Sequence, residues 1–185
     1  MAWAGINRTM SDIKVAEVKT SAIKDQSGAG LVTFPTKPFF HVIRTNSGGS
    51  ISINGIITFD SSPVTNQGSH WDTSGNYFLV PVAGVYQFNF SAIGAGSGAT
   101  AVGAGGEVQV LLEKSTNNGG SYSEIINGSY YYMSTGAQTL PNMTFSASVL
   151  LAVNNRIRIN NNKGYLYVGT TASKYNVTFT GHLIG

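Results

Sequence analysis

Three histidines are the side chains of this 185-residue chain that first suggest acid–base or metal chemistry. His41, His70 and His182 lie far apart in the sequence, and none belongs to a motif with metal-ligand spacing. Cysteine is absent, which excludes a disulfide, a thiolate metal site and a cysteine nucleophile. No serine stands in a Gly-x-Ser-x-Gly elbow, and no glycine-rich stretch matches a dinucleotide- or phosphate-binding loop. We therefore expect the histidines on strand or loop surfaces, with no metal or cofactor.

The carboxylates offer no clear pair for general acid–base catalysis. Glu107, Glu113 and Glu124 have no spacing that predicts two cooperating acids. Asp60 and Asp72 are isolated, whereas calcium requires several oxygen ligands in one cluster. Isolated aspartates are typical of turns, because their side chains accept hydrogen bonds from nearby backbone amides. The sequence thus predicts a protein that is not an enzyme.

Two groups of side chains suit binding rather than catalysis. Arg156 and Arg158 alternate with isoleucines, so on a strand they share one face, which is either solvated or in contact with a carboxylate or a glycan. Tyr130, Tyr131 and Tyr132 are adjacent, so they cannot all face one core and at least one is expected at the surface. Exposed tyrosines suit recognition of sugars or protein surfaces, and packing, including packing between subunits, is the alternative.

The composition limits the partners. Only 10% of the residues are charged, against roughly 25% in an average soluble domain, and the formal net charge is +3. The basic excess is small and spread out, whereas phosphate binding needs clustered Lys and Arg, so we expect no nucleic-acid partner. No apolar run approaches the roughly 20 residues that span a bilayer, so we expect no membrane insertion. The first residues also lack the pattern of a secretory signal peptide.

The elements that would position these residues are short strands. The chain holds 23 glycines and many Asn, Ser and Thr residues, which suit tight turns and cost helix stability. Residues 38–185 contain about eight to ten short apolar segments between turn signals, which predict an all-β sandwich or jelly roll. Asn54-Gly55 predicts the two-residue turn of a hairpin within 51–59. The Gly/Ala-rich segment 94–106 predicts a loop, or strand ends that pack closely at a symmetry axis.

Residues 1–37 differ from the rest of the chain. They hold five of the eleven bases and three of the eight acids. Their apolar residues fit neither the period of a strand nor that of a helix cleanly, and we favour an extended arm of short strands over a helix. An arm this short cannot bury a core of its own, so it is expected to fold against copies of itself or against a partner.

A spaced aromatic pattern in the predicted head resembles a known family. The pattern comprises Asn66, Trp71, Phe78, Gly84, Tyr86, Phe88 and Phe90. Its intervals match the signature of the globular heads of the C1q and tumour-necrosis-factor-like superfamily, although the preceding Phe59 lies one residue too far upstream. The closing VTFTGHLIG and the opening FFHVIRTN resemble the family's last and first strands. The resemblance implies a C1q/TNF-like jelly roll over residues 38–185 that assembles as a compact homotrimer.

The arm carries a second resemblance. VAEVKTSAIKDQSGAGLVTF resembles stretches that open many tailed-bacteriophage fibre and virion proteins. It implies that residues 1–37 anchor the chain to other virion proteins or form a trimerising stalk, beneath a head formed by residues 38–185. The expected function is a non-enzymatic structural and adhesion protein of the virion, on capsid or tail: a short fibre, head fibre or decoration protein. A host-surface glycan or protein is a candidate partner, and the alternative is a bacterial or spore-surface C1q-like structural protein.

Overall fold

The computed structural model describes most of the chain from residue 37 onward. The described residues are 37–45, 49–51, 55–60, 62–95, 107–131, 142–168 and 177–184. They form strands and no helix, which confirms the all-β prediction, and none of them builds a helix that could cross a membrane. Residues 1–36, and with them nearly all of the predicted arm, lie outside the described residues, as do residues 96–106 of the Gly/Ala-rich segment.

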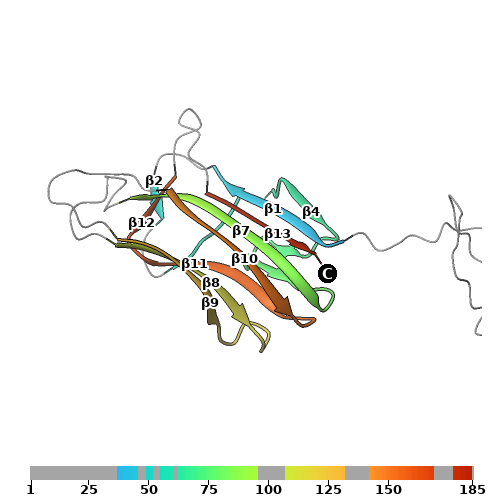
Figure 1. Cartoon of the computed structure of the whole chain (residues 1–185). Helices are drawn as coiled ribbons and strands as arrows, with labels where there is room; N and C mark the ends of the chain where they lie inside the picture. The colour runs from blue at the N-terminus through green and yellow to red at the C-terminus, as the bar shows by residue number, and fades with distance from the viewer. Residues whose placement is uncertain are drawn as a thin grey trace, which may run out of the picture. The chain divides into compact units, whose positions relative to one another are not determined.

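The described strands form two antiparallel sheets. The first sheet contains β1 (Phe39–Arg44), β2 (Gly49–Ile51), β4 (Thr65–Gln67), β7 (Gly84–Ala95), β10 (Asn142–Leu151), β12 (Tyr165–Val168) and β13 (Val177–Leu183). Its order is β2–β12–β7–β13–β1–β4, and β10 pairs with the other side of β7. Strand β7 therefore lies in the middle of this sheet, between β10 and β13 (Figure 1).

The second sheet packs against the first, as the two layers of Figure 1 show. It contains β3 (Gly55–Ile56), β5 (Trp71–Asp72), β6 (Tyr77–Leu79), β8 (Glu107–Ser115), β9 (Ser123–Tyr131) and β11 (Arg156–Lys163). Its order is β5–β6–β11–β8–β9, with β3 paired to β11. Two antiparallel sheets stacked in this way form the predicted jelly-roll sandwich.

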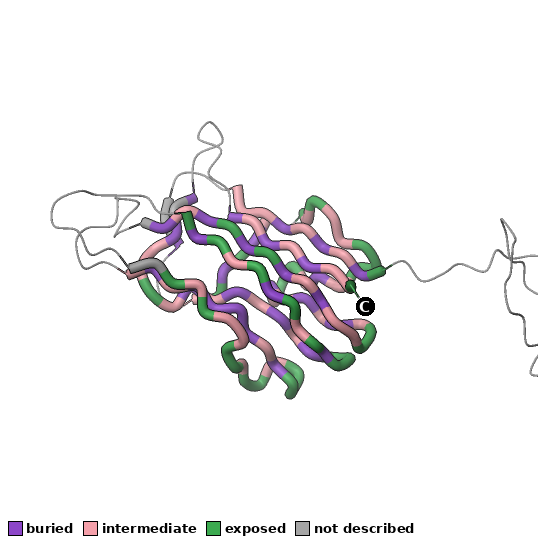
Figure 2. The backbone as a smooth tube through the Cα atoms, viewed as in Figure 1, coloured by how far each residue is buried: buried purple, intermediate pink, exposed green. Residues whose placement is uncertain are grey.

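Alternation along the strands builds the core between the sheets. On β7, Tyr86, Phe88 and Phe90 are buried, while Gln87 and Asn89 point the other way and reach solvent. Figure 2 shows this alternation of buried with exposed or intermediate residues along neighbouring strands. Successive side chains of a strand point to opposite faces, so each strand of the first sheet contributes one side to the core and one to the outer face.

The aromatic residues of the signature lie in this core, and they come from both sheets. Phe78 belongs to β6 of the second sheet, and its ring lies 5.6 Å from that of Tyr86 and 6.3 Å from that of Phe88 on β7. The segment between β6 and β7, which includes Pro81, carries the chain from one sheet to the other. Proline has no backbone N–H to give to a ladder, so it suits such a crossing.

Asn66, the first residue of the signature, closes a loop. Its side-chain oxygen accepts a hydrogen bond from the backbone N–H of Trp71 at 2.9 Å, and its amide nitrogen donates to the Trp71 carbonyl at 3.1 Å. This pair fixes Trp71, which is 3% exposed, against the ring of Phe40 at 5.0 Å. The spacing between Asn66 and Trp71 therefore sets the length of the loop that places the Trp71 ring in the core.

The predicted hairpin at Asn54-Gly55 is wrong. Strand β2 pairs with β12 in the first sheet, whereas β3 pairs with β11 in the second. The two strands that the turn should join therefore belong to different sheets, and the passage between them, residues 52–54 with Asn54, lies outside the described residues. Ile51 and Ile57, which flank this passage, are both buried, and burial of the apolar residues on either side outweighs the local turn preference of Asn-Gly.

The two aspartates are turn and loop formers, as predicted. Asp72 accepts hydrogen bonds from the Ser74 hydroxyl at 2.7 Å and from the backbone amides of Ser74 and Gly75 at 2.9 and 2.8 Å. These hydrogen bonds lower the pKa of Asp72 from 3.8 to about 2, and the bond from the Ser74 hydroxyl makes the largest contribution. Asp60 accepts bonds from the backbone and hydroxyl of Thr45 at 3.1 and 2.6 Å, which ties the end of β1 to the segment after β3.

The lowered pKa of Asp72 predicts a small acid-dependent term in stability. The carboxylate bound in the folded state stabilises the protein above pH 3.8, and this contribution disappears as the pH falls toward 2. Because the carboxylate is largely in water, we expect Asp72→Asn to lower the free energy of unfolding at neutral pH by about 1 kcal/mol or less. Urea unfolding at several pH values should show the difference shrinking below pH 3.8. Glu124→Gln, at an exposed side chain of β9, is the control, and an undiminished difference near pH 2 would contradict the prediction.

Candidate interaction surface

The side chains that could perform acid–base or metal chemistry do not converge. His41 and His182 lie on the outer side of the first sheet, whereas His70 precedes β5 and its ring lies 6.5 Å from that of Phe78. Among the described residues, no three His, Cys, Asp or Glu side chains lie together as a metal site would require. A hollow between β9 and β10, lined by 127–129 and 142–145, contains no ionisable side chain.

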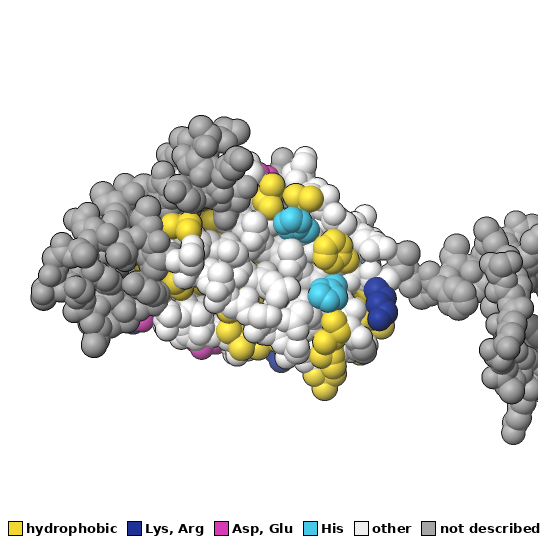
Figure 3. Space-filling view, turned by 45° about the horizontal axis from the view of Figure 1, so that its top comes forward, with side chains coloured by type: hydrophobic (Ala, Val, Ile, Leu, Met, Phe, Trp, Pro, Cys, Tyr) yellow, Lys and Arg dark blue, Asp and Glu magenta, His cyan; other side chains and the backbone are white. Residues whose placement is uncertain are grey.

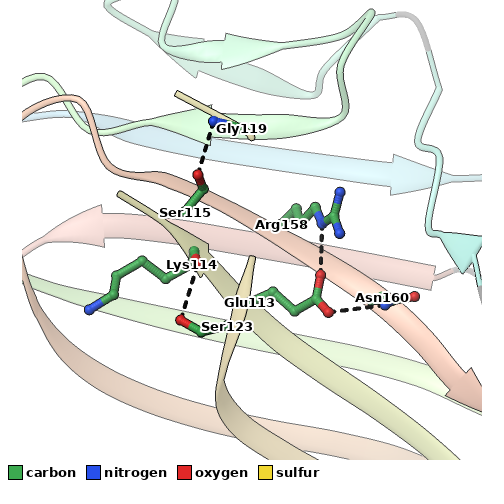
Figure 4. A network of polar contacts seen from close by, with 7 residues as sticks. All are labelled: Glu113, Lys114, Ser115, Gly119, Ser123, Arg158 and Asn160. Carbon is green, nitrogen blue, oxygen red and sulfur yellow. Dashed lines mark hydrogen bonds and ion pairs between the residues drawn. The ribbon is translucent and has the colours of Figure 1, made fainter. Parts of the chain in front are cut away.

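Glu107 and Glu113 are bound to cations of the second sheet. Glu113 accepts from Arg158 Nε at 2.7 Å and from Asn160 Nδ2 at 3.0 Å, as Figure 4 shows. Glu107 forms an ion pair with Lys163 at 2.9 Å. Glu113 stands opposite Glu124 in the β8–β9 register, but its two oxygens are taken by Arg158 and Asn160.

The two arginines share the outer face of the second sheet, as predicted. The guanidinium of Arg158 lies 3.5 Å from the ring centre of Tyr122, and that of Arg156 lies 4.4 Å from that of Tyr77. Arg156 also donates to the side chain of Asn118. The sequence left open whether a carboxylate contacts these arginines, and in the structure Glu113 of the same chain binds Arg158. Many polar groups of this face are therefore already bound within the chain.

The outer face of the first sheet has a different chemistry. Its outward side chains include Phe39, His41, Ile43, Val85, Gln87, Asn89, Ser91, Thr144, Ser146, Ser148, Leu150, Thr178, Thr180, His182 and Ile184. None of these is Asp, Glu, Lys or Arg, and we call this set the uncharged face. Figure 3 shows a face that is largely white, the colour of the backbone and of side chains that are neither hydrophobic nor ionisable, with histidines beside hydrophobic side chains and charged groups toward its edges.

The polar side chains of the uncharged face bind one another. Asn89 on β7 donates to the hydroxyl of Thr180 at 3.4 Å and accepts from that of Ser146 at 2.8 Å. Gln87 donates to Ser146 at 2.6 Å and accepts from Ser148 at 2.5 Å. These bonds cross from β13 through β7 to β10. Because the groups already have partners and fixed positions, covering this face would cost little side-chain entropy and leave few polar groups unpaired.

One end of the uncharged face is apolar. Leu150 lies opposite Val85 in the register of β10 with β7, and the Ile184 amide donates to the Val85 carbonyl at 2.9 Å, so the three form a row. Leu150 is 75% exposed and Ile184 45% exposed. Val82 and Val153, in the adjoining loops, are also about half exposed. An exposed apolar cluster beside a polar face without charges is typical of a surface that another protein covers.

The tyrosine run is only partly placed. Tyr130 and Tyr131 end β9, opposite Val108 and Glu107 of β8, and Tyr132 lies outside the described residues. Their role in recognition stays a prediction. Sequence reasoning missed the uncharged face, although its signal was present: Ser, Thr, Asn, Gln and His alternate with apolar residues in 85–91, 144–150 and 178–184.

Comparisons with known proteins agree with this fold. The family model of the C1q domain matches residues 39–184. The globular domain of zebrafish complement 1qA protein is similar in structure, with a TM-score of 0.55, 18% identity, and 80% of this chain and 98% of that chain covered. Eiger TNF from S. frugiperda gives a TM-score of 0.58 at 12% identity, covering 80% of this chain and 94% of that chain. No curated protein matches the chain. The match to the family model extends over nearly the whole described head, and the chain belongs to the C1q domain family.

Proposed function

We propose that this chain is a non-enzymatic structural and adhesion protein of a bacteriophage virion, a short fibre, head fibre or decoration protein, whose head forms a homotrimer through the uncharged face. The observation that carries the homotrimer is that face itself, which presents hydrogen-bonded polar groups and an apolar row without Asp, Glu, Lys or Arg, whereas the virion role is supported by the resemblance of residues 1–37. Domains of the C1q and TNF type are usually non-enzymatic and typically form homotrimers.

The uncharged face suits self-assembly better than the outer face of the second sheet does. Removing a charge from water is costly unless it gains a partner, and none of the outward side chains named for the uncharged face carries such a charge. The second sheet would have to bury Arg156, Arg158 and Lys163 with their partners. The apolar row of Val85, Leu150 and Ile184 adds a favourable contribution when water leaves it.

The arm and the trimer together suit an appendage. Residues 1–37 would attach to other virion proteins, as the resemblance of this segment to tailed-bacteriophage proteins implies. Three heads on one attachment point would present three copies of any recognition surface, so weak contacts with a host glycan or protein would multiply. The region of Tyr130–Tyr132 is the candidate for those contacts.

Two experiments test the proposal. Light scattering on the purified full chain should give three times the chain mass of 19.5 kDa, and a monomer at micromolar concentration would overturn assembly. Immunogold electron microscopy with antibody to residues 38–185 should label virus particles from the source culture, at the tail for host adhesion or over the capsid for decoration. Deleting residues 1–37 should abolish labelling while the head stays folded. Absence of label on every particle would overturn the virion role and favour the cell-surface alternative.

A further inference from the structure

We propose that the two histidines of the uncharged face make the assembled head acid-labile, so that protonation of His41 and His182 separates its subunits. The inference rests on the proposed function, because it requires that copies of the chain meet through this face. It adds a condition under which the assembly forms and comes apart.

The register places both histidines on neighbouring strands and on the same side. Strand β1 runs antiparallel to β13, with Phe39 opposite His182 and His41 opposite Thr180. His41 and His182 are both partly buried in the single chain, and the His182 ring centre lies 6.4 Å from that of Phe39. A neighbouring copy on this face would therefore cover both imidazole rings.

Every strand beside the histidines presents neutral groups to them. Strand β13 contributes Thr178 and Thr180, and β7 contributes Gln87 and Asn89 opposite His182 and Thr180. On the other side, β4 places Thr65 opposite His41 and Gln67 opposite Phe39.

The charged groups nearest in the chain cannot neutralise an imidazolium. Lys37, which precedes β1, has the same sign as a protonated histidine. Arg44 donates to Thr58, and Asp60 is bound to Thr45 at the far end of β1. Among the described outward side chains of this face, no carboxylate is available to pair with His41 or His182.

This environment has a clear consequence on acidification. Histidine is the side chain whose charge ordinarily changes between about pH 5 and pH 8. Neutral imidazole both donates and accepts hydrogen bonds, so it suits a face of hydroxyl and amide groups. Protonation would leave two unpaired positive charges on each subunit beneath the neighbouring copy, and an unpaired buried charge is strongly unfavourable. Like charges from the three copies would also repel one another.

The third histidine provides a matched control within the chain. His70 precedes β5 and lies beside Phe78 of the second sheet. Its carbonyl accepts from the Leu79 amide at 2.8 Å, so its backbone belongs to the β5–β6 region. It is not on the uncharged face, and its protonation is not expected to affect assembly.

The test measures subunit association at about pH 7.5 and about pH 5 by light scattering and sedimentation. We expect the wild-type chain to be trimeric at the higher pH, with an apparent dissociation constant about 100-fold larger or more at the lower. His41→Gln/His182→Gln should keep its assembly at both pH values, and His70→Gln should behave as wild type. Circular dichroism should show retained β structure at the lower pH.

The outcomes separate this inference from the proposed function. A wild-type chain that is monomeric at about pH 7.5 refutes assembly itself. Any one of three results would overturn the histidine mechanism. The wild-type trimer persists at about pH 5, the double variant responds to acid as strongly as the wild type, or His70→Gln loses the acid response. If the double variant fails to assemble, the single variants His41→Gln and His182→Gln must each show a reduced acid response. An undiminished acid response in both single variants refutes the histidine mechanism. Acid dissociation that coincides with loss of β structure also refutes it.

Discussion

Replacing Phe40 with alanine is expected to lower the free energy of unfolding by about 3–5 kcal/mol. Phe40 is fully buried on β1, and its ring centre lies 4.8 Å from that of Phe78 and 5.0 Å from that of Trp71 in the second sheet. It also lies 5.0 Å from Phe179 on β13. The side chain thus joins both sheets, and its removal leaves a cavity that rigid aromatic neighbours cannot fill.

Urea unfolding, followed by circular dichroism at one fixed protein concentration, would measure this loss. The concentration must be equal because assembly contributes to the apparent stability of the folded state. Val64→Ala removes an apolar side chain that is 54% exposed, and it should change the free energy by about 0.5 kcal/mol or less. A change below about 1 kcal/mol for Phe40→Ala would mean that the core does not depend on this aromatic contact.

The aromatic residues of this core could be predicted from the sequence because the pattern that identifies them lies within one short segment. The spacing from Asn66 to Phe90 encodes a loop closed by one asparagine, a crossing between sheets and a strand with one apolar side. The sequence did not show which strands pair with one another. Gly181 is an example: a Cβ there would lie 2.4 Å from Phe40 Cε1 and 2.7 Å from Phe88 Cδ1. The glycine makes room for rings about 140 and 93 positions earlier in the chain, and only the β1–β13–β7 register brings them there.

The candidate surface was hidden from the sequence for the same reason. Gln87, Ser146 and Thr180 are ordinary outward positions when each strand is taken alone. Antiparallel pairing of β7 with both β10 and β13 places them in one hydrogen-bonded group, although they come from three distant segments. Likewise, Arg158 was expected to share a face with Arg156, but its partner Glu113 is 45 residues away and is set by the β8–β11 register.

Replacing Leu150 with aspartate is expected to convert the assembled head into a folded monomer. Leu150 is 75% exposed in the single chain, so the change should alter the stability of the isolated head by about 0.5 kcal/mol or less. In the assembly it would place a carboxylate in the row with Val85 and Ile184, where no outward side chain named for the uncharged face is Lys or Arg. Lys114, which lines a hollow together with Leu150, belongs to β8 of the second sheet. A buried charge without a partner costs about 3–5 kcal/mol, which corresponds to a loss of affinity of roughly 100-fold or more.

Light scattering at neutral pH and at one protein concentration would measure the change, with circular dichroism to confirm the fold. Ile56→Asp, at a 41% exposed side chain of the second sheet, is the control for a new carboxylate elsewhere and should stay trimeric. Equal dissociation of both variants, or a trimeric Leu150→Asp protein, would contradict assembly through the uncharged face.

A second substitution at the same position separates charge from shape. Asparagine has nearly the shape of aspartate but no charge, and its amide could join the hydrogen-bonded Ser and Gln side chains of the neighbouring row. If the cost of Leu150→Asp comes from burying charge, Leu150→Asn should retain most of the assembly, with an affinity reduced about 10-fold or less. If both variants dissociate alike, loss of the apolar contact is the cause, and the row of Val85, Leu150 and Ile184 holds the copies together by hydrophobic burial rather than by exclusion of charge.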